Sequence, residues 1–144
     1  MRSKLLHDGA EKTFALIYET GDEVVAGLTR FAKEHRPRSA HFTAIGAFRD
    51  AVLAYFDWPT KAYQDIPVSE QVEVLMLAGD IAWKDGGEPV VHAHVVIGRS
   101  DGSTRGGHLK SAHVRPTLEL VLVEYPKHLE RKHDLESGLA LIRV

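Results

Sequence analysis

The sequence predicts an α+β fold in which a mostly antiparallel sheet of about six to seven strands packs against one main helix, at about residues 22–35. Two observations lead to this prediction. Apolar and polar residues alternate over most of the chain, as they do in strands, and helical spacing is confined to one segment. The 144 residues, of which 44% are hydrophobic, are enough for one core, so we expect a single domain over residues 1–144.

The elements are expected in the following order. Residues 12–19 alternate as a strand does. Thr20 and Glu23 have the spacing of a capping box, and the apolar residues after them repeat at helical intervals until a stop before Pro37. Further strands are expected at 39–48, 51–57, 70–83, 90–98, 107–114, 117–125 and 138–143. Gly79 and Asp80 are expected to mark a bend or bulge, and residues 126–137 a charged surface connection or short helix.

Composition excludes several classes of protein. The chain has no cysteine, which rules out disulfides, zinc sites built from thiolates and cysteine nucleophiles. No apolar run approaches the ~18–20 residues that cross a bilayer, and the N-terminus does not resemble a signal peptide. We therefore expect a cytoplasmic protein without a membrane partner. The formal net charge of −2 is a poor basis for gripping nucleic-acid phosphates.

The segment Val90 to Glu119 holds the most informative motif. His92 and His94 are two residues apart in an expected strand, so both side chains point to the same face, ~6–7 Å apart along the backbone. Two neutral imidazoles at this spacing can bind one metal ion such as zinc. The alternative is that they are ordinary polar residues on a half-exposed strand.

A third histidine follows the Asp101-Gly102 turn. A strict two-residue turn would place His108 on the wrong face, opposite Val95. One extra residue at Gly106-Gly107 would bring it to the same face as His92 and His94. A three-residue turn centred on Asp101 would instead set it directly opposite His94.

Three histidines would leave a tetrahedral ion with one open position, for an activated water or a carboxylate. The carboxylates of Glu73, Asp80 and Glu119 are possible neighbours of this site. A fourth ligand from a neighbouring subunit is equally conceivable. His41 is expected to be a partly buried structural histidine. No nucleophile elbow or phosphate-binding loop is present, so catalytic residues stay unassigned.

Short segments in a fixed order carry a resemblance to a known family. They are Thr13-Phe14-Ala15-Leu16, Gly21-Asp22-Glu23-Val24, Phe31-Ala32, Ala44-Ile45-Gly46-Ala47, Glu73-Val74-Leu75, Gly79-Asp80-Ile81, His92-Ala93-His94-Val95, Gly106-Gly107-His108-Leu109 and Pro116-Thr117-Leu118-Glu119. Over almost its whole length the chain resembles a bacterial, stand-alone member of the plant-and-prokaryote-conserved (PPC) domain family. The resemblance implies a homotrimer with a metal, usually zinc, on His92, His94 and His108.

The resemblance leaves the function open between three classes. The favoured hypothesis is a metal-binding trimer that recognises a small molecule or a protein partner. The second is a DNA-binding regulatory protein, by family label, although the chain lacks the Gly-Arg-Pro core of an AT-hook. The third is a metal-dependent hydrolase or lyase, and whether the chain is an enzyme is left undecided.

Overall fold

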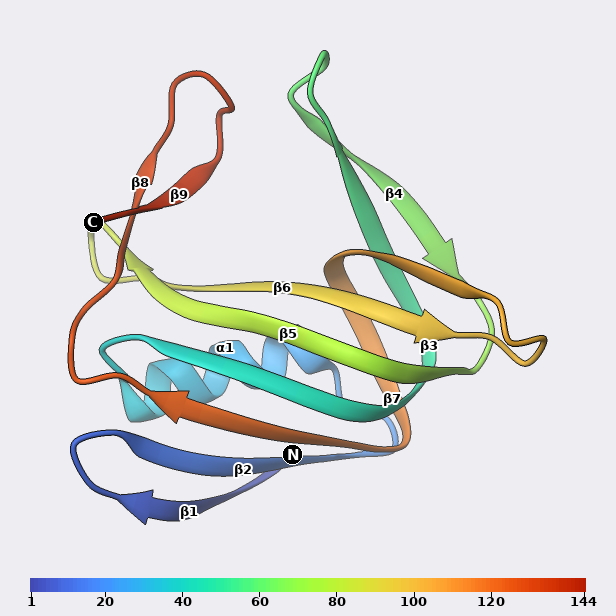
Figure 1. Cartoon of the computed structure of the whole chain (residues 1–144), viewed down its shortest axis with the longest axis horizontal. Coiled ribbons are helices and arrows are strands. Elements are labelled where there is room, and N and C mark those ends of the chain that lie inside the picture. Colours follow the sequence, from blue (N-terminus) through green and yellow to red (C-terminus); the bar gives the residue numbers. More distant parts are fainter.

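A computed structural model describes residues 1–144 and consists mainly of strands (Figure 1). The elements are β1 (Arg2–Asp8), β2 (Lys12–Glu19), α1 (Val24–His35), β3 (Ala40–Asp57), β4 (Ala62–Val68), β5 (Val72–Lys84), β6 (Pro89–Gly98), β7 (Thr104–Glu124), β8 (Glu130–His133) and β9 (Ala140–Arg143). The sheet runs β1-β2-β7-β3-β5-β8-β9, with β4 on β3, and with β6 on both β5 and β7. Only the β5–β8 pair is parallel.

The predicted fold class is wrong. An α+β fold with about six to seven strands was expected, but the sheet is mixed and has nine strands, and α1 is a helix of only 12 residues. The sequence missed β1 and β4, and it read the region of β8 as a charged connection. Every residue of β1 is exposed, so β1 has no buried face to produce an alternating pattern, and its pairing with β2 holds it in place.

Two strands are also longer than the pattern indicated. The expected strands 39–48 and 51–57 are one continuous strand, β3, and 107–114 and 117–125 are both parts of β7. Pro116 lies in the stretch of β7 that skips pairing with β3, between the pairs Phe48–Val114 and Gly46–Leu118. Its missing N–H therefore removes no hydrogen bond to β3, and the strand continues through it.

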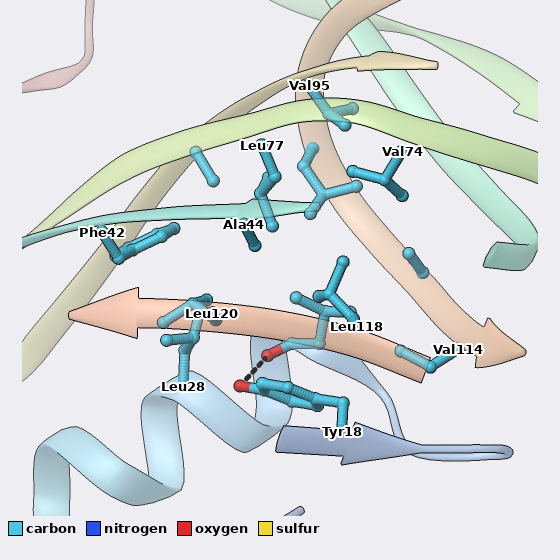
Figure 2. Close-up of a cluster of buried hydrophobic side chains, with 14 of the residues drawn as sticks. Tyr18, Leu28, Phe42, Ala44, Val74, Leu77, Val95, Val114, Leu118 and Leu120 are labelled. Atoms are coloured by element: carbon cyan, nitrogen blue, oxygen red, sulfur yellow. Dashed lines mark hydrogen bonds between the residues drawn. The ribbon is translucent and has the colours of Figure 1, made fainter. Parts of the chain in front are cut away.

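The core lies between α1 and one face of the sheet (Figure 2). Leu28 of α1 is fully buried, as is Tyr18 of β2, whose hydroxyl donates a hydrogen bond to the Val24 carbonyl at 3.2 Å. The Glu23 carboxylate accepts hydrogen bonds from the backbone N–H groups of Val25 and Ala26. Glu23 is thus the N-cap itself, which explains why the helix begins at Val24 and not at about residue 22.

Residues on the other face of the strands point away from α1. The register aligns Thr43 of β3 with Val121 of β7 and Ala78 of β5, and Ala78 in turn with His94 of β6. Large apolar side chains on this outer surface remain 44–59% exposed: Ile45, Leu75, Met76, Val96 and Val121. We call these five residues the outer apolar patch. The chain's helix is neither long nor apolar enough to span a membrane.

The bulge expected at Gly79 and Asp80 is absent, because the register of β5 with both neighbours is regular there. The irregularities lie instead at Val74/Met76 and at Ala44/Gly46. Gly79 is instead required for steric reasons, because a Cβ at this position would collide with the His92 carbonyl oxygen and the Phe42 ring. This glycine lets β5 and β6 approach closely beside the histidines.

Candidate metal centre

The three predicted histidines come together on the outer face. His92 and His94 lie on β6, and His108 lies on β7 directly opposite His94. One ring nitrogen from each lies within 4.8 Å of the others. The ring centroids are 5.1 Å apart for His92 and His94, 5.3 Å for His92 and His108, and 5.5 Å for His94 and His108. Three imidazoles so arranged can converge on one ion.

The turn between β6 and β7 sets this register. Arg99 N–H donates to the Ser103 carbonyl at 2.8 Å and Gly102 N–H to the Arg99 carbonyl at 2.9 Å, which closes a three-residue loop centred on Asp101. Gly102 has a φ of 80°, as the αL position of such a loop requires. The three-residue alternative is therefore the one that forms.

No bulge occurs at Gly106 and Gly107, since the β6–β7 register is unbroken from Gly98–Thr104 to His94–His108. Gly107 instead permits β3 to approach, because a Cβ there would lie 2.8 Å from the Ala54 carbonyl oxygen. Gly107 thus marks the packing of β7 against β3, whereas a Cβ on Gly106 would lie 3.1 Å from the Val95 carbonyl oxygen of β6.

The electrostatics of the cluster favour neutral imidazoles. Burial, followed by the neighbouring His92 and His94, lowers the pKa of His108 to about 4. Burial, and then His92, also lower the pKa of His94. The buried Nδ1 of His108 has no hydrogen-bond partner in the protein. A buried polar atom without a partner is costly, and a metal ligand is one role that would satisfy it. The residues present therefore fit a metal ion.

One of the three carboxylates proposed from the sequence lies at the site. Asp80 of β5 pairs with His92 in register, and its Oδ2 is 3.5 Å from His92 Nδ1. Glu73 and Glu119 lie farther along their strands, opposite Gly98 and Ile45 respectively. Asp80 can therefore orient the His92 ring, as carboxylates behind metal-binding histidines commonly do.

Asp80 is held in turn by Arg131 of β8, whose Nη2 donates to Asp80 Oδ1 at 2.6 Å. Burial by itself would raise the pKa of Asp80. The interactions with His92 and Arg131 outweigh burial, so the net pKa is lowered and the carboxylate stays ionised. His41 is opposite Asp80 on β3 but outside the cluster, and contrary to expectation it is exposed, stacked on Tyr125 at 5.1 Å.

The sequence did not single out two residues beside the cluster. Tyr63 of β4 stacks on His108 with ring centroids 4.6 Å apart. Arg131 is only 6% exposed although it lies in a charged segment, Glu130–His133, that was expected on the surface. No local pattern marks either residue. Only the parallel pairing of β8 with β5, which aligns Arg131 with Lys84, brings that arginine to the site.

Comparison with known proteins agrees with the resemblance seen in the sequence. Residues 7–126 match the Plants and Prokaryotes Conserved domain, abbreviated PCC or PPC. The chain belongs to this family. The predicted membership is therefore confirmed, and the PPC fold provides the setting for the histidine cluster.

Solved structures of similar chains share this PPC fold closely. A metal-containing protein of Archaeoglobus fulgidus is 36% identical, with a TM-score of 0.84 over 92% of this chain and 94% of that one. A PPC protein of Pyrococcus horikoshii is 31% identical, with a TM-score of 0.85 over 99% and 95%. A Bacteroides thetaiotaomicron protein, described provisionally as DNA-binding, is 30% identical, with a TM-score of 0.87 over 98% and 96%.

A curated relative extends the comparison to a longer protein. The Bifunctional protein GlmU of Synechococcus is 31% identical over 99% of this chain. The chain spans 22% of the length of that relative.

Proposed function

We propose that this chain is a zinc-binding PPC domain that assembles as a homotrimer and binds a small-molecule ligand at its histidine cluster. The observation that carries the proposal is the convergence of three imidazole nitrogens within 4.8 Å, one of them on a ring whose buried Nδ1 has no partner. The similar Archaeoglobus protein is described as containing a metal. Three neutral imidazoles suit zinc and leave one coordination position open to a ligand, where the ion would act as a Lewis acid.

The outer apolar patch supports the trimer. Its five large side chains are roughly half exposed and lie on a sheet face that no helix of this chain covers. Apolar surface of this kind is typical of an interface between subunits, and closed symmetric assembly would bury it in every copy. His94 is exposed on this same face, so a neighbouring subunit that covers the patch would lie close to the metal centre.

The proposal is tested by metal content and assembly mass. The untagged protein, purified without chelator, is analysed by elemental mass spectrometry and by native mass spectrometry. We expect about one zinc per chain and the mass of three chains. A protein that stays metal-free after incubation with zinc would reduce the histidines to a polar strand surface, and a monomeric mass would refute the trimer.

A DNA-binding role is the alternative, raised by the description of the Bacteroides relative. Lys and Arg number 18 against 20 Asp and Glu, so the charge of this chain supplies little general attraction for phosphates. Fluorescence anisotropy with labelled duplex DNA should therefore show only weak, strongly salt-dependent binding. Tight sequence-selective binding at physiological salt would reverse this ordering.

A metal-dependent hydrolase or lyase is the further alternative. It would need a base with a pKa near neutral beside the ion. The pKa of Asp80, the carboxylate nearest the cluster, is lowered by its partners despite its burial, so it is a weak base. The site is therefore better suited to binding a ligand than to catalysis. The contacts of Asp80 suit it to positioning the His92 ring.

A further inference from the structure

A cavity of about 290 Å³ adjoins the histidine cluster. The β8–β9 and β3–β4 hairpins both project at the top of the view in Figure 1, and β6 runs below them. The residues that line the cavity come from both hairpins and from the strands below, with Tyr63 on β4, His92 on β6, His108 on β7, Arg131 on β8 and Leu141 on β9. Two of the three cluster histidines thus form part of its wall.

Both charged side chains that line this cavity are cationic. Arg131 is 6% exposed, and it donates from Nη2 to Asp80 and from Nη1 to the Ala140 carbonyl at 2.9 Å. Its Nε–H is buried and has no hydrogen-bond partner in the protein. Lys84 is the second cation. A buried guanidinium N–H without a partner beside a cavity is a ready donor to a ligand.

The charge balance favours an anion. Asp80 compensates one positive charge, which leaves a surplus from Arg131 and Lys84, and an ion on the histidines would add to it. The apolar wall of Val90, Val91, Leu139 and Leu141 would in addition accept a hydrocarbon group.

We propose that this cavity binds a small organic acid, with its carboxylate on the guanidinium of Arg131 and a short hydrocarbon tail against β6 and β9. The proposal deepens the small-molecule function proposed above and names its ligand class. It rests on Arg131 and the apolar wall, so it holds whether or not the histidines carry a metal. A guanidinium matches a carboxylate better than an ammonium does, because its donors lie in one plane.

A neighbouring hollow provides a contrast. It is lined by Lys84, Asp85, Arg131, His133, Gly138 and Ala140 and therefore contains an acidic side chain, with Ala140 its only apolar residue. Neither its charge nor its surface favours an organic acid. The proposal therefore commits to the cavity on the histidine side of Arg131.

The test uses 3-methylbutanoate as the probe and its neutral isostere 3-methylbutanamide as the comparison. Titration of the full chain is followed by ¹H–¹⁵N NMR, in metal-free and in zinc-loaded protein. We expect the acid to bind at least about tenfold more tightly than the amide in both forms, because a guanidinium forms a stronger hydrogen bond with a carboxylate than with a neutral amide. Shifts should centre on the amides of Val91, Leu139 and Leu141. Equal binding of acid and amide, or shifts elsewhere, would overturn the proposal.

Variants separate Arg131 from the general charge of the protein. Arg131→Met should lose at least tenfold in affinity for the acid, whereas Lys132→Met, which removes an exposed neighbouring cation, should change it less than twofold. Because Arg131 also holds β8 to β5, Lys84→Met provides a second test, with an expected loss of about threefold and Asp80–Arg131 left intact. The assignment would be refuted if Lys84→Met and a correctly folded Arg131→Met variant both bound the acid with unchanged affinity.

Two outcomes separate this proposal from the metal proposal. Acid binding that persists in metal-free protein, with no zinc taken up, would support the Arg131 site and refute the metal centre. One zinc bound per chain, with equal affinity for the acid and the amide, would support the metal centre and refute the Arg131 site. Inorganic phosphate is the competitor: displacement of 3-methylbutanoate by equimolar phosphate would overturn the role of the apolar wall.

Discussion

The two faces of β6 differ although they alternate along the same ten residues. Ala93 and Val95 point towards α1 and are each 2% exposed, whereas His92 and His94 point to the opposite face, where His92 is half-buried and His94 is exposed. The inner face stabilises the fold by burying apolar area. The outer face of β6 holds polar side chains whose position is set by the fold but which contribute little to its stability. Stability and the proposed binding can therefore be perturbed separately, one face at a time.

The largest expected effect is on the outer face. His92→Ala combined with His94→Ala should abolish stoichiometric zinc, with at least a hundredfold loss of affinity, because one imidazole cannot hold the ion alone. The metal-free variant should unfold within about 1 kcal/mol of metal-free wild type, since exposed polar side chains contribute little to stability. Calorimetric zinc titration and urea unfolding measure the two quantities. Unchanged metal content would refute the assigned ligands.

A cavity on the inner face should have the opposite effect. Leu28→Ala removes a fully buried side chain of α1 and should lower the free energy of unfolding by about 3 kcal/mol. Zinc affinity of the folded fraction should stay within twofold of wild type. Leu135→Ala is the matched control, because Leu135 is 92% exposed and its loss should leave urea unfolding unchanged. A large loss of zinc affinity in Leu28→Ala would show that the faces are coupled.

Asp80→Asn should affect both properties, since Asp80 contacts His92 and Arg131. We expect zinc affinity to fall about 10- to 100-fold through loss of the partner that orients His92. Stability should fall by about 1–3 kcal/mol because Arg131 is left buried without its carboxylate. Asp65→Asn is the control, an exposed carboxylate paired with Lys110. Equal effects of the two variants would remove the positioning role of Asp80.

The pH dependence of that stability loss has a definite sign. The pKa of Asp80 is lower in the folded protein than its ordinary value of 3.8. Its contribution is therefore fully present above pH 4–5 and is lost as the pH falls through the folded pKa. The difference in unfolding free energy between wild type and Asp80→Asn should be constant near pH 7 and should narrow below about pH 4. A difference that grows on acidification would contradict the assignment.

The smallest expected effect concerns His108 in metal-free protein. The pKa of His108 in the folded protein is about 4, against an ordinary value of 6.5. Below about pH 6.5 the unfolded chain therefore binds a proton at His108 that the folded chain does not bind, and this favours unfolding. Metal-free wild type should lose about 1 kcal/mol between pH 7 and pH 4.5, after allowance for its partial exposure. In His108→Gln the loss should be smaller by this amount. Urea unfolding across this pH range measures it, and parallel profiles would contradict the low pKa.

Local pattern was enough to predict some features of the site. The alternation of β6 put His92 and His94 on one face, and the Asp101-Gly102 turn returned His108 to them. The choice between a bulge and a three-residue turn was open from the sequence, because both satisfy the same parity. In the structure, the hydrogen bonds that close the loop from Arg99 to Ser103 decide it. The strand count failed because edge strands such as β1 are defined by hydrogen bonds to a neighbour and have no buried face.

The sequence by itself determined the family, the pair of histidines on one strand face and the absence of thiolate ligands. These follow from residue identity and a period of two, which are local properties of the chain. Only the tertiary structure decided that Asp80 stands behind His92, that Tyr63 covers His108, and that Arg131 closes a cationic cavity beside them. The physical reason is that such contacts join residues as far apart as Asp80 and Arg131, whose meeting depends on the parallel pairing of β8 with β5. That pairing is fixed by how the whole sheet packs, and no short stretch of sequence encodes it.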